Sequence, residues 1–144
     1  MLNSLRDCLG LNKRTSLLLL GINSAGKTSI LYRLLLGELM KVIPTVGIIY
    51  VVDSTSRDYI EETKSTLYHC ILIKDEAQHY PIIVFANKQD LPNAMSTLEI
   101  TEKLELNEIK DRSWHIQGTS ASTGEGLYEG LDWIYDEIQN KKQD

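Results

Sequence analysis

Residues Gly21 to Thr28 read GINSAGKT and fit G-x-x-x-x-G-K-[ST], a loop that wraps backbone N–H groups around nucleotide phosphates. In this pattern Lys27 reaches the terminal phosphates, and the Thr28 hydroxyl ligates Mg²⁺. The apolar run 16–20 (SLLLL) is typical of a buried strand that enters the loop, and 29–36 (SILYRLLL) of the helix that leaves it. The alternative is an ordinary glycine turn, which does not explain the Lys-Thr pair. The pattern therefore predicts nucleotide binding.

A second polar segment, Asn87-Lys88-Gln89-Asp90, directly follows the apolar run 82–86 (IIVFA). It lies at the carboxyl end of a predicted strand, where open α/β sheets bind ligands. The Asp90 carboxylate can accept hydrogen bonds from the ring N–H and exocyclic amine of guanine, a donor pair that adenine lacks. Lys88 can lay its alkyl chain along the base, and Asn87 can tie this loop to the phosphate loop. The alternative is a polar loop that only caps a strand.

A third segment, Thr119-Ser120-Ala121-Ser122, follows the alternating run 114–118. The backbone N–H of Ala121 can donate to the guanine carbonyl, an acceptor that adenine lacks. Three such segments at successive strand ends predict a pocket that selects GTP and GDP over ATP.

The remaining pattern alternates strands with helices, which is typical of a mostly parallel α/β sheet with helices on both faces. The predicted strands are 16–20, 48–53, 82–86 and 114–118. Asp58 with Glu61, and Ser96 with Glu99, have the spacing of capping boxes at helix starts. The closing helix has a predicted buried face made of Leu127, Leu131, Ile134 and Ile138.

The composition indicates one soluble domain. The chain has 144 residues, of which 42% are hydrophobic and 24% charged. A net charge of -5 argues against nucleic acid as a partner. Two cysteines provide no disulfide framework, and no apolar run has the length of a membrane span. We expect a cytoplasmic monomer.

The segments GINSAGKTSILYRLLLGE, IPTVG, VVDSTSRD, FANKQDLPNAM and GLYEGLDWI resemble the ADP-ribosylation-factor (Arf and Arf-like) family of Ras-type small GTPases. The resemblance covers nearly all of the chain, from about Leu11 to Ile138. It implies a three-layer P-loop NTPase fold with a six-stranded sheet, bound Mg²⁺ with GTP or GDP, and slow GTP hydrolysis. It further implies a switch role in ER–Golgi vesicle and protein transport, with exchange factors, GTPase-activating proteins and effectors as partners.

By position, the resemblance assigns a phosphate and Mg²⁺ site, a base site and a first-switch threonine. The phosphate site comprises Gly21, Asn23, Ser24, Ala25, Gly26, Lys27, Thr28 and Ser29. The base site comprises Asn87, Lys88, Asp90, Ser120 and Ala121, and Thr45 is the threonine that would join Thr28 on the metal.

One part of the family pattern is missing. The family has several dozen residues between IPTVG and the strand that here reads IIYVVD, whereas here Gly47 runs straight into Ile48. The missing part supplies two antiparallel strands, the second switch and an Asp-x-Gly-Gly-Gln segment that positions the attacking water. No catalytic residue is therefore identifiable, and Lys27 only supports phosphate charge. We predict an amphipathic segment at 1–14 and a G domain at 15–140, truncated by a deletion at the 47/48 junction.

The junction also conflicts with a metal role for Thr45. A ligand must lie at the carboxyl end of the sheet, whereas Ile48 starts a strand at the opposite end, roughly 17 Å away. The residues from Thr45 to Ile48 span at most about 11 Å. If the junction is a true peptide bond, we predict that Thr45 does not bind Mg²⁺.

The N-terminus departs from the family as well. Leu2 stands where the family has a myristoylated glycine, so that lipidation is not available. Leu2, Leu5 and Leu9 fall on one helical face beside Cys8, a candidate for acylation. A short helix packed on the domain is the favoured interpretation; the alternative is weak peripheral contact with Golgi-type membranes.

The motifs leave three functional hypotheses. The first is a guanine-nucleotide switch of the Arf-like class. The second is a non-switching protein that binds GDP or partners without hydrolysing GTP. The third is an ATP-dependent kinase, against which Asp90 and the lack of an arginine-rich lid argue.

Overall fold

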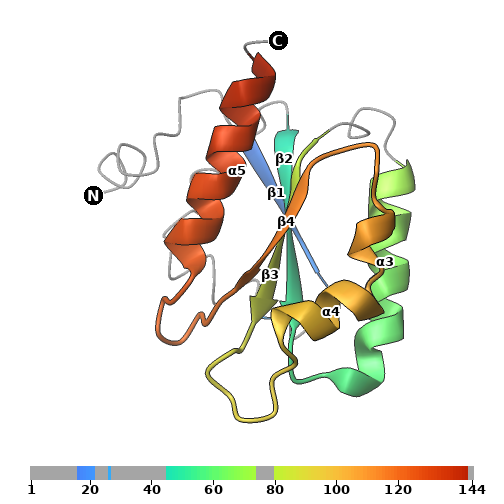
Figure 1. Ribbon diagram of the computed structural model, residues 1–144, viewed down its shortest axis with the longest axis vertical. Coiled ribbons are helices and arrows are strands. Elements are labelled where there is room, and N and C mark those ends of the chain that lie inside the picture. Colours follow the sequence, from blue (N-terminus) through green and yellow to red (C-terminus); the bar gives the residue numbers. More distant parts are fainter. Residues whose placement is uncertain (1–15, 22–25, 27–44, 74–79, 143–144) are drawn as a thin grey trace.

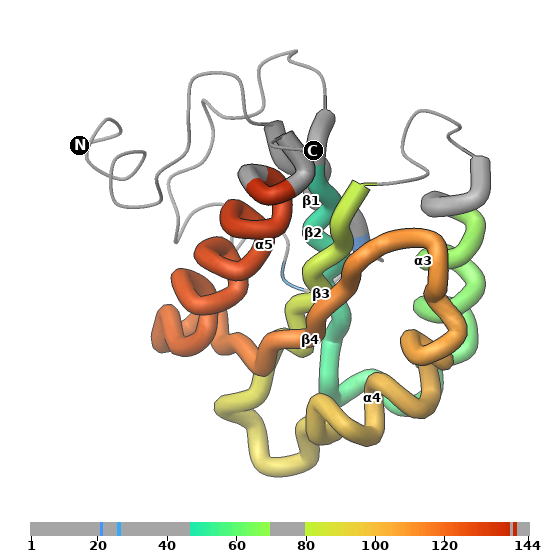
Figure 2. The backbone as a smooth tube through the Cα atoms, turned by 45° about the horizontal axis from the view of Figure 1, so that its top comes forward, coloured from blue at the N-terminus to red at the C-terminus, as the bar shows by residue number. Residues whose placement is uncertain are grey.

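The computed structural model describes residues 16–21, 26, 45–73 and 80–142. Within these ranges a parallel four-stranded sheet in the order β1-β2-β3-β4 forms the middle layer. Helix α5 covers one face, and α3 and α4 cover the other (Figures 1 and 2). The elements are β1 (Ser16–Leu20), β2 (Thr45–Asp53), η2 (Arg57–Tyr59), α3 (Ile60–Ile73), β3 (Ile82–Asn87), α4 (Thr97–Lys103), η4 (Leu106–Glu108), β4 (Trp114–Gly118) and α5 (Leu127–Lys142). The prediction of an α/β fold with three layers is confirmed.

Strands β1, β2 and β3 form at short apolar runs of the sequence, and those of β2 and β3 are rich in β-branched residues. Strands β1 and β4 have the predicted bounds, and β3 extends the predicted run by Asn87. All residues of β3 are buried. A strand with helices on both faces must be apolar on both sides, which explains the continuous rather than alternating pattern of IIVFA.

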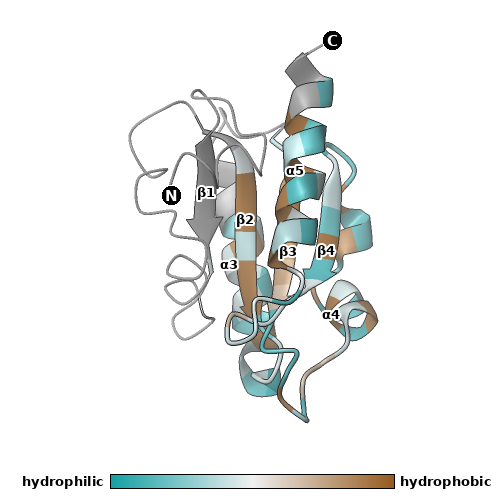
Figure 3. Cartoon of the chain, turned by 90° about the vertical axis from the view of Figure 1, so that its left-hand side faces the viewer, coloured by the Kyte–Doolittle hydropathy of each residue, from teal (hydrophilic) through white to brown (hydrophobic). Residues whose placement is uncertain are grey.

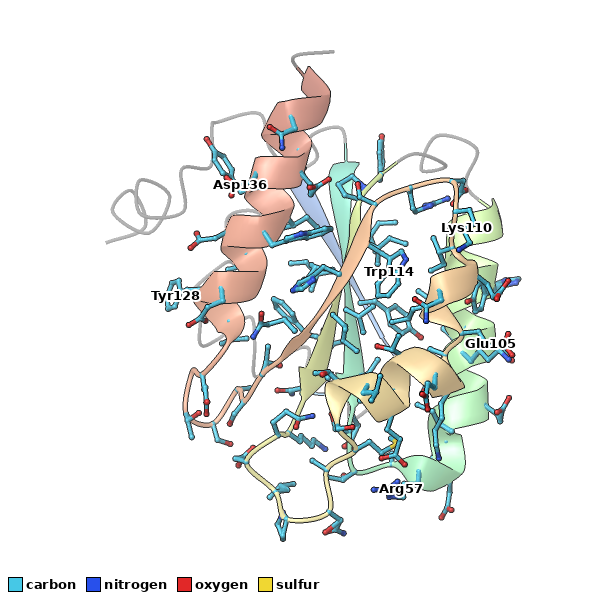
Figure 4. All side chains as sticks on the ribbon, viewed as in Figure 1. Arg57, Glu105, Lys110, Trp114, Tyr128 and Asp136 are labelled. Atoms are coloured by element: carbon cyan, nitrogen blue, oxygen red, sulfur yellow. The ribbon has the colours of Figure 1, made fainter. Side chains whose placement is uncertain are left out.

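The two faces of the sheet bury different side chains. Tyr50 and Val84 belong to the core cluster that also holds Leu67 of α3 and Ile100 of α4. Trp114 extends from β4 to this same side and packs on the cluster (Figure 4). On the opposite face, α5 buries its predicted residues Leu127, Leu131, Ile134 and Ile138. Figure 3 shows hydrophobic residues along β2, between the two helical layers.

Only one of the two predicted helix caps is correct. Ser96 is the N-cap of α4, and its hydroxyl accepts a hydrogen bond from the Glu99 N–H at 3.1 Å. The prediction that Asp58 caps the preceding helix is wrong, because Asp58 lies inside the 3-10 turn η2 that leads into α3. The Asp53 carboxylate binds the hydroxyl of Ser56 at 2.9 Å, so the chain turns tightly directly after β2.

Strand β2 begins earlier than predicted and passes through the 47/48 junction. Thr45 is its first residue and pairs with Ser16, while Gly47 and Ile48 pair with successive residues of β1. The register shifts between Ser16 and Leu17, which accommodates Val46. The strand predicted at 48–53 therefore includes Thr45, Val46 and Gly47 as well. The β-branched residues before Gly47 extend the strand alongside β1.

Several predicted features lie outside the described residues. These are the segment 1–14, with Leu2, Leu5, Leu9 and Cys8, most of the phosphate loop, and the helix predicted at 29–36. Among the helices that are described, none is long and apolar enough to span a bilayer.

Candidate nucleotide-binding site

The carboxyl ends of the parallel strands bring the predicted loops to one rim of the sheet. Asp53 at the end of β2 pairs with Asn87 at the end of β3, and Ala86 pairs with Gly118 at the end of β4. A cavity of about 210 Å³ opens at this rim. Its lining comprises Gly26, Asn87, Lys88, Asp90, Ala121 and Ser122. Each of the three predicted segments thus contributes at least one residue to the same cavity.

Asn87 joins the three loops. It is buried, and its Oδ1 accepts hydrogen bonds from the Ala121 N–H at 3.1 Å and the Thr119 hydroxyl at 3.3 Å. Its Nδ2 lies directly against the backbone of Gly26 in the phosphate loop. The structure therefore supports the expectation that Asn87 ties the second loop to the first, and adds a link to the third.

Gly26 is required by both its conformation and its surroundings. Its φ of +101° is one that other residues rarely adopt. A Cβ at this position would collide with Nδ2 of Asn87. The second glycine of GINSAGKT therefore allows close approach of the phosphate loop to Asn87. Gly21, the first glycine, directly follows β1.

Lys88 lines the cavity in an unusual backbone conformation. Its φ of 66° is in the left-handed region, which costs roughly 1–2 kcal/mol for a residue with a side chain. Its Nζ donates to Oδ2 of Asp53 at 2.8 Å, across from β3 to the end of β2. Non-glycine residues held in this region are concentrated at functional sites.

The charge of Asp53 is stabilised at this rim. Burial by itself would raise the pKa of its carboxyl group. Hydrogen bonds from Lys88, from the hydroxyl and N–H of Thr55, and from the hydroxyl of Ser56 outweigh burial and hold the pKa below its ordinary value. Asp53 is therefore an anion at neutral pH and a firm partner for the Lys88 ammonium group.

Asp90 lies at the cavity, where the sequence predicts a contact with the base. It lines the cavity and is exposed. Within the described part of the chain, its carboxylate forms no hydrogen bond or ion pair that would compete with a ligand. Among the described residues, both carboxylate oxygens are therefore free to accept hydrogen bonds, as the prediction for the two guanine N–H groups requires.

The third loop is held by its own hydrogen bonds. The Ser120 N–H donates to the Glu125 carbonyl at 3.0 Å, and the Ser120 hydroxyl accepts from the Thr123 N–H at 3.2 Å. Ser120 is buried, so its place in the site is to shape this turn. The Ala121 N–H, the predicted donor to the guanine carbonyl, instead donates in the structure to Oδ1 of Asn87 at 3.1 Å.

Sequence reasoning missed Gln89, Asp53 and Ser54. The Gln89 Nε2 donates to the Ser54 hydroxyl and to the Met95 carbonyl, both at 2.9 Å. The Met95 N–H in turn donates to the Ser54 carbonyl at 2.7 Å. These bonds fasten the loop that carries Asp90 to the end of β2. The sequence feature that could have indicated them is the polar pair Asp53-Ser54 at the carboxyl end of a predicted strand.

The structure does not bring Thr45 to the rim, so its assignment as a Mg²⁺ ligand is corrected. Thr45 starts the nine-residue strand β2 and Asp53 ends it eight positions later, which separates Thr45 from the rim by roughly 26 Å. This agrees with the prediction that Thr45 lies away from the metal site if Gly47 and Ile48 are joined by a peptide bond. The cause is the direct link between Gly47 and Ile48, which draws Thr45, Val46 and Gly47 into the strand.

The remaining phosphate-site residues cannot be placed in this way. They lie outside the described residues and comprise Asn23, Ser24, Ala25, Lys27, Thr28 and Ser29. In the described part of the chain, no group of three or more His, Cys, Asp or Glu side chains gathers to hold a metal ion.

A parallel sheet whose carboxyl rim carries a GINSAGKT loop and an NKQD loop defines a P-loop nucleotide-binding protein. The chain also matches the family model described as Arf, the ADP-ribosylation factor family, over residues 1–48 and 46–138. It belongs to this family of small GTPases and is a GTP-binding Arf-like protein. The two matched segments meet at the Gly47–Ile48 junction.

Proposed function

We propose that this protein binds GDP and GTP at the described cavity and acts as an Arf-class regulator of intracellular vesicle and protein transport. The observation that supports guanine binding best is the open Asp90 carboxylate in a cavity whose other walls come from all three loops. The proposed partners are exchange factors, GTPase-activating proteins and trafficking effectors. The proposed location is the cytoplasm, with peripheral contact at Golgi membranes.

Base selectivity follows from hydrogen bonding at Asp90. Guanine presents two donors to its carboxylate, whereas adenine would leave both acceptor oxygens without a donor. A bidentate contact of this kind discriminates between bases by about 1–3 kcal/mol. We therefore expect GDP to bind about 10-fold to 100-fold more tightly than ADP.

Titration with fluorescent GDP, GTP and ATP analogues tests this proposal. Equal or tighter ATP binding would refute guanine selectivity and favour the kinase hypothesis. In Asp90→Asn, one acceptor becomes a donor, so preference should move from guanine toward xanthine nucleotides. Asp136→Asn removes a carboxylate from the outer side of α5, far along the helix (Figure 4), and serves as the charge-matched control. An unchanged preference in Asp90→Asn would refute its role.

Phosphate binding is tested separately at Lys27. Lys27→Ala should remove most of the affinity for GDP and GTP, because Lys27 is the cation of the phosphate-loop pattern. Base preference should remain in the residual binding. Full affinity in Lys27→Ala would show that the phosphates are not held by this loop.

A second candidate function concerns hydrolysis. Thr45 is part of β2, and Gly47 is followed directly by Ile48, where the family has its Asp-x-Gly-Gln segment. Both observations favour a form that holds guanine nucleotide without cycling through hydrolysis. A single-turnover assay with GTP should show no release of phosphate above the uncatalysed rate. A rate typical of the family would show that another group positions the water.

A further inference from the structure

Asp53 is a buried carboxylate outside the predicted nucleotide motifs. Its side chain is 8% exposed. Oδ1 accepts from the N–H and the hydroxyl of Thr55, at 2.9 and 2.7 Å. Oδ2 accepts from the hydroxyl of Ser56 at 2.9 Å and from Nζ of Lys88 at 2.8 Å. Such a fully bonded, nearly buried carboxylate has a fixed orientation, and the cation that it binds among the described residues, Lys88, belongs to the base loop.

Lys88 has no other ion-pair partner in the described part of the chain. A lysine side chain carries about 2 kcal/mol of rotamer entropy, so an untethered Lys88 would spend much of its time in solvent. Its exposed fraction is 32%, which leaves the rest of the side chain against protein. Lys88 can serve as a stable wall of the cavity only if its end is held.

We propose that Asp53 is a positioning residue for base binding, which holds the Lys88 ammonium group so that the Lys88 alkyl chain forms one wall of the guanine cavity. This inference rests on the proposed guanine-binding function. Thr55 and Ser56 contribute by orienting the carboxylate before the base arrives. The low pKa of Asp53 agrees with this role, because it keeps the tether charged at neutral pH.

The alternative is that Asp53 only stabilises the turn after β2 through Thr55 and Ser56. The two roles make different predictions for ligands. A positioning role affects ligands that have a base and leaves ligands that have only phosphates unchanged. A purely structural role changes both, or neither.

Asp53→Asn separates these roles, because the amide retains Oδ1 as an acceptor for Thr55 but removes the charge that holds Lys88. The probes are a fluorescent GDP analogue and inorganic pyrophosphate as its competitor. We expect GDP affinity to fall by roughly tenfold, with pyrophosphate affinity unchanged. Asp136→Asn, the charge-matched control, should behave as wild type. Unchanged GDP affinity in Asp53→Asn, or an equal loss for pyrophosphate, would overturn the inference.

A double-mutant cycle with Lys88→Met tests whether the effect passes through Lys88. Methionine keeps an apolar chain of similar length but has no ammonium group for Asp53 to hold. Asp53→Asn should therefore weaken GDP binding in the wild-type background and have almost no further effect in Lys88→Met. Additive losses would refute the positioning role, because neighbouring residues that act as a unit are non-additive.

Two further measurements distinguish failure of this inference from failure of guanine binding itself and from misfolding of the Asp53→Asn variant. If wild type shows no preference for GDP over ADP, the proposed function fails, and the inference is overturned with it. If Asp53→Asn does not fold, Thr55→Val removes one hydroxyl donor from the same carboxylate. It should weaken GDP binding by a smaller factor than tenfold and leave pyrophosphate unchanged; no change for GDP would overturn the inference.

Discussion

Replacing Asn87 by alanine tests whether this residue is the joint between the three loops. The substitution removes the acceptor of the Ala121 N–H at 3.1 Å and of the Thr119 hydroxyl at 3.3 Å. Thr119 is buried, so its hydroxyl would be left without an acceptor. A buried polar group left unsatisfied costs about 1–3 kcal/mol. The Ala121 N–H lies at the cavity wall, where water can replace Asn87 at lower cost.

We therefore expect Asn87→Ala to lower the free energy of unfolding by roughly 2–3 kcal/mol. Urea unfolding of the nucleotide-free chain measures this, provided that the slope with denaturant stays constant. Thr119→Val is the matched control. It removes only the longer of the two bonds and should cost less than about 1 kcal/mol.

The comparison of Asn87→Ala with Thr119→Val tests whether Asn87 joins the three loops. If Asn87→Ala costs no more than Thr119→Val, the bonds from Oδ1 do not hold the rim together. GDP binding should then also be equal in both variants. The joint described here requires a larger loss of stability and a larger loss of GDP affinity in Asn87→Ala.

Three other predictions concern different parts of the chain. Gly26→Ala should weaken GDP binding at least tenfold, since its φ and its contact with Asn87 both exclude a Cβ. Glu105→Gly should raise the free energy of unfolding by roughly 0.5–1 kcal/mol, because Glu105 has a φ of 53° directly after α4, where glycine is favoured. The third prediction concerns acid. The lowered pKa of Asp53 means that the folded chain binds fewer protons here than the unfolded chain. This contribution to stability is complete above about pH 4 and is lost as pH falls through the folded pKa. Urea unfolding against pH should therefore show a shallower acid decline in Asp53→Asn.

Each of these predictions has a contrary outcome. Wild-type GDP affinity in Gly26→Ala would mean that the two loops can separate without loss of the site. A lower urea midpoint in Glu105→Gly would mean that its ion pair with Lys64, at 3.1 Å, outweighs the backbone conformation. Parallel acid curves for Asp53→Asn and wild type would mean that Asp53 titrates alike in the folded and unfolded chain.

Much of the fold follows from local pattern. The runs SLLLL and IIVFA are both short and apolar, which predicts strands, and β1 and β3 form there. The run IIVFA is buried throughout, as a strand with helices on both faces requires. The spacing of Leu127, Leu131 and Ile134 similarly determined the buried face of α5. These features depend on residues close in sequence, which is why the sequence alone could predict them.

The features that were mispredicted or missed depend on distant partners. Thr45 joined β2 because β1 offers a parallel partner, which the family pattern of a loop at IPTVG does not reveal. Asp58 does not cap a helix because it lies inside a turn, which the hydrogen bond between Asp53 and Ser56 helps to form. The functions of Asp53 and Gln89 depend on contacts with residues 35 positions away, Lys88 and Ser54. No local spacing rule contains such pairs.

The early start of β2 has a consequence for signalling. By the family resemblance, Thr45 matches the first-switch threonine, which would join Thr28 on the metal. Here its backbone belongs to a ladder with β1, and moving it would require breaking sheet hydrogen bonds. We therefore expect the surface at this edge of the sheet to have the same conformation with GDP and with GTP bound. A partner that binds this edge could then distinguish nucleotide-bound from nucleotide-free protein, but not GTP from GDP.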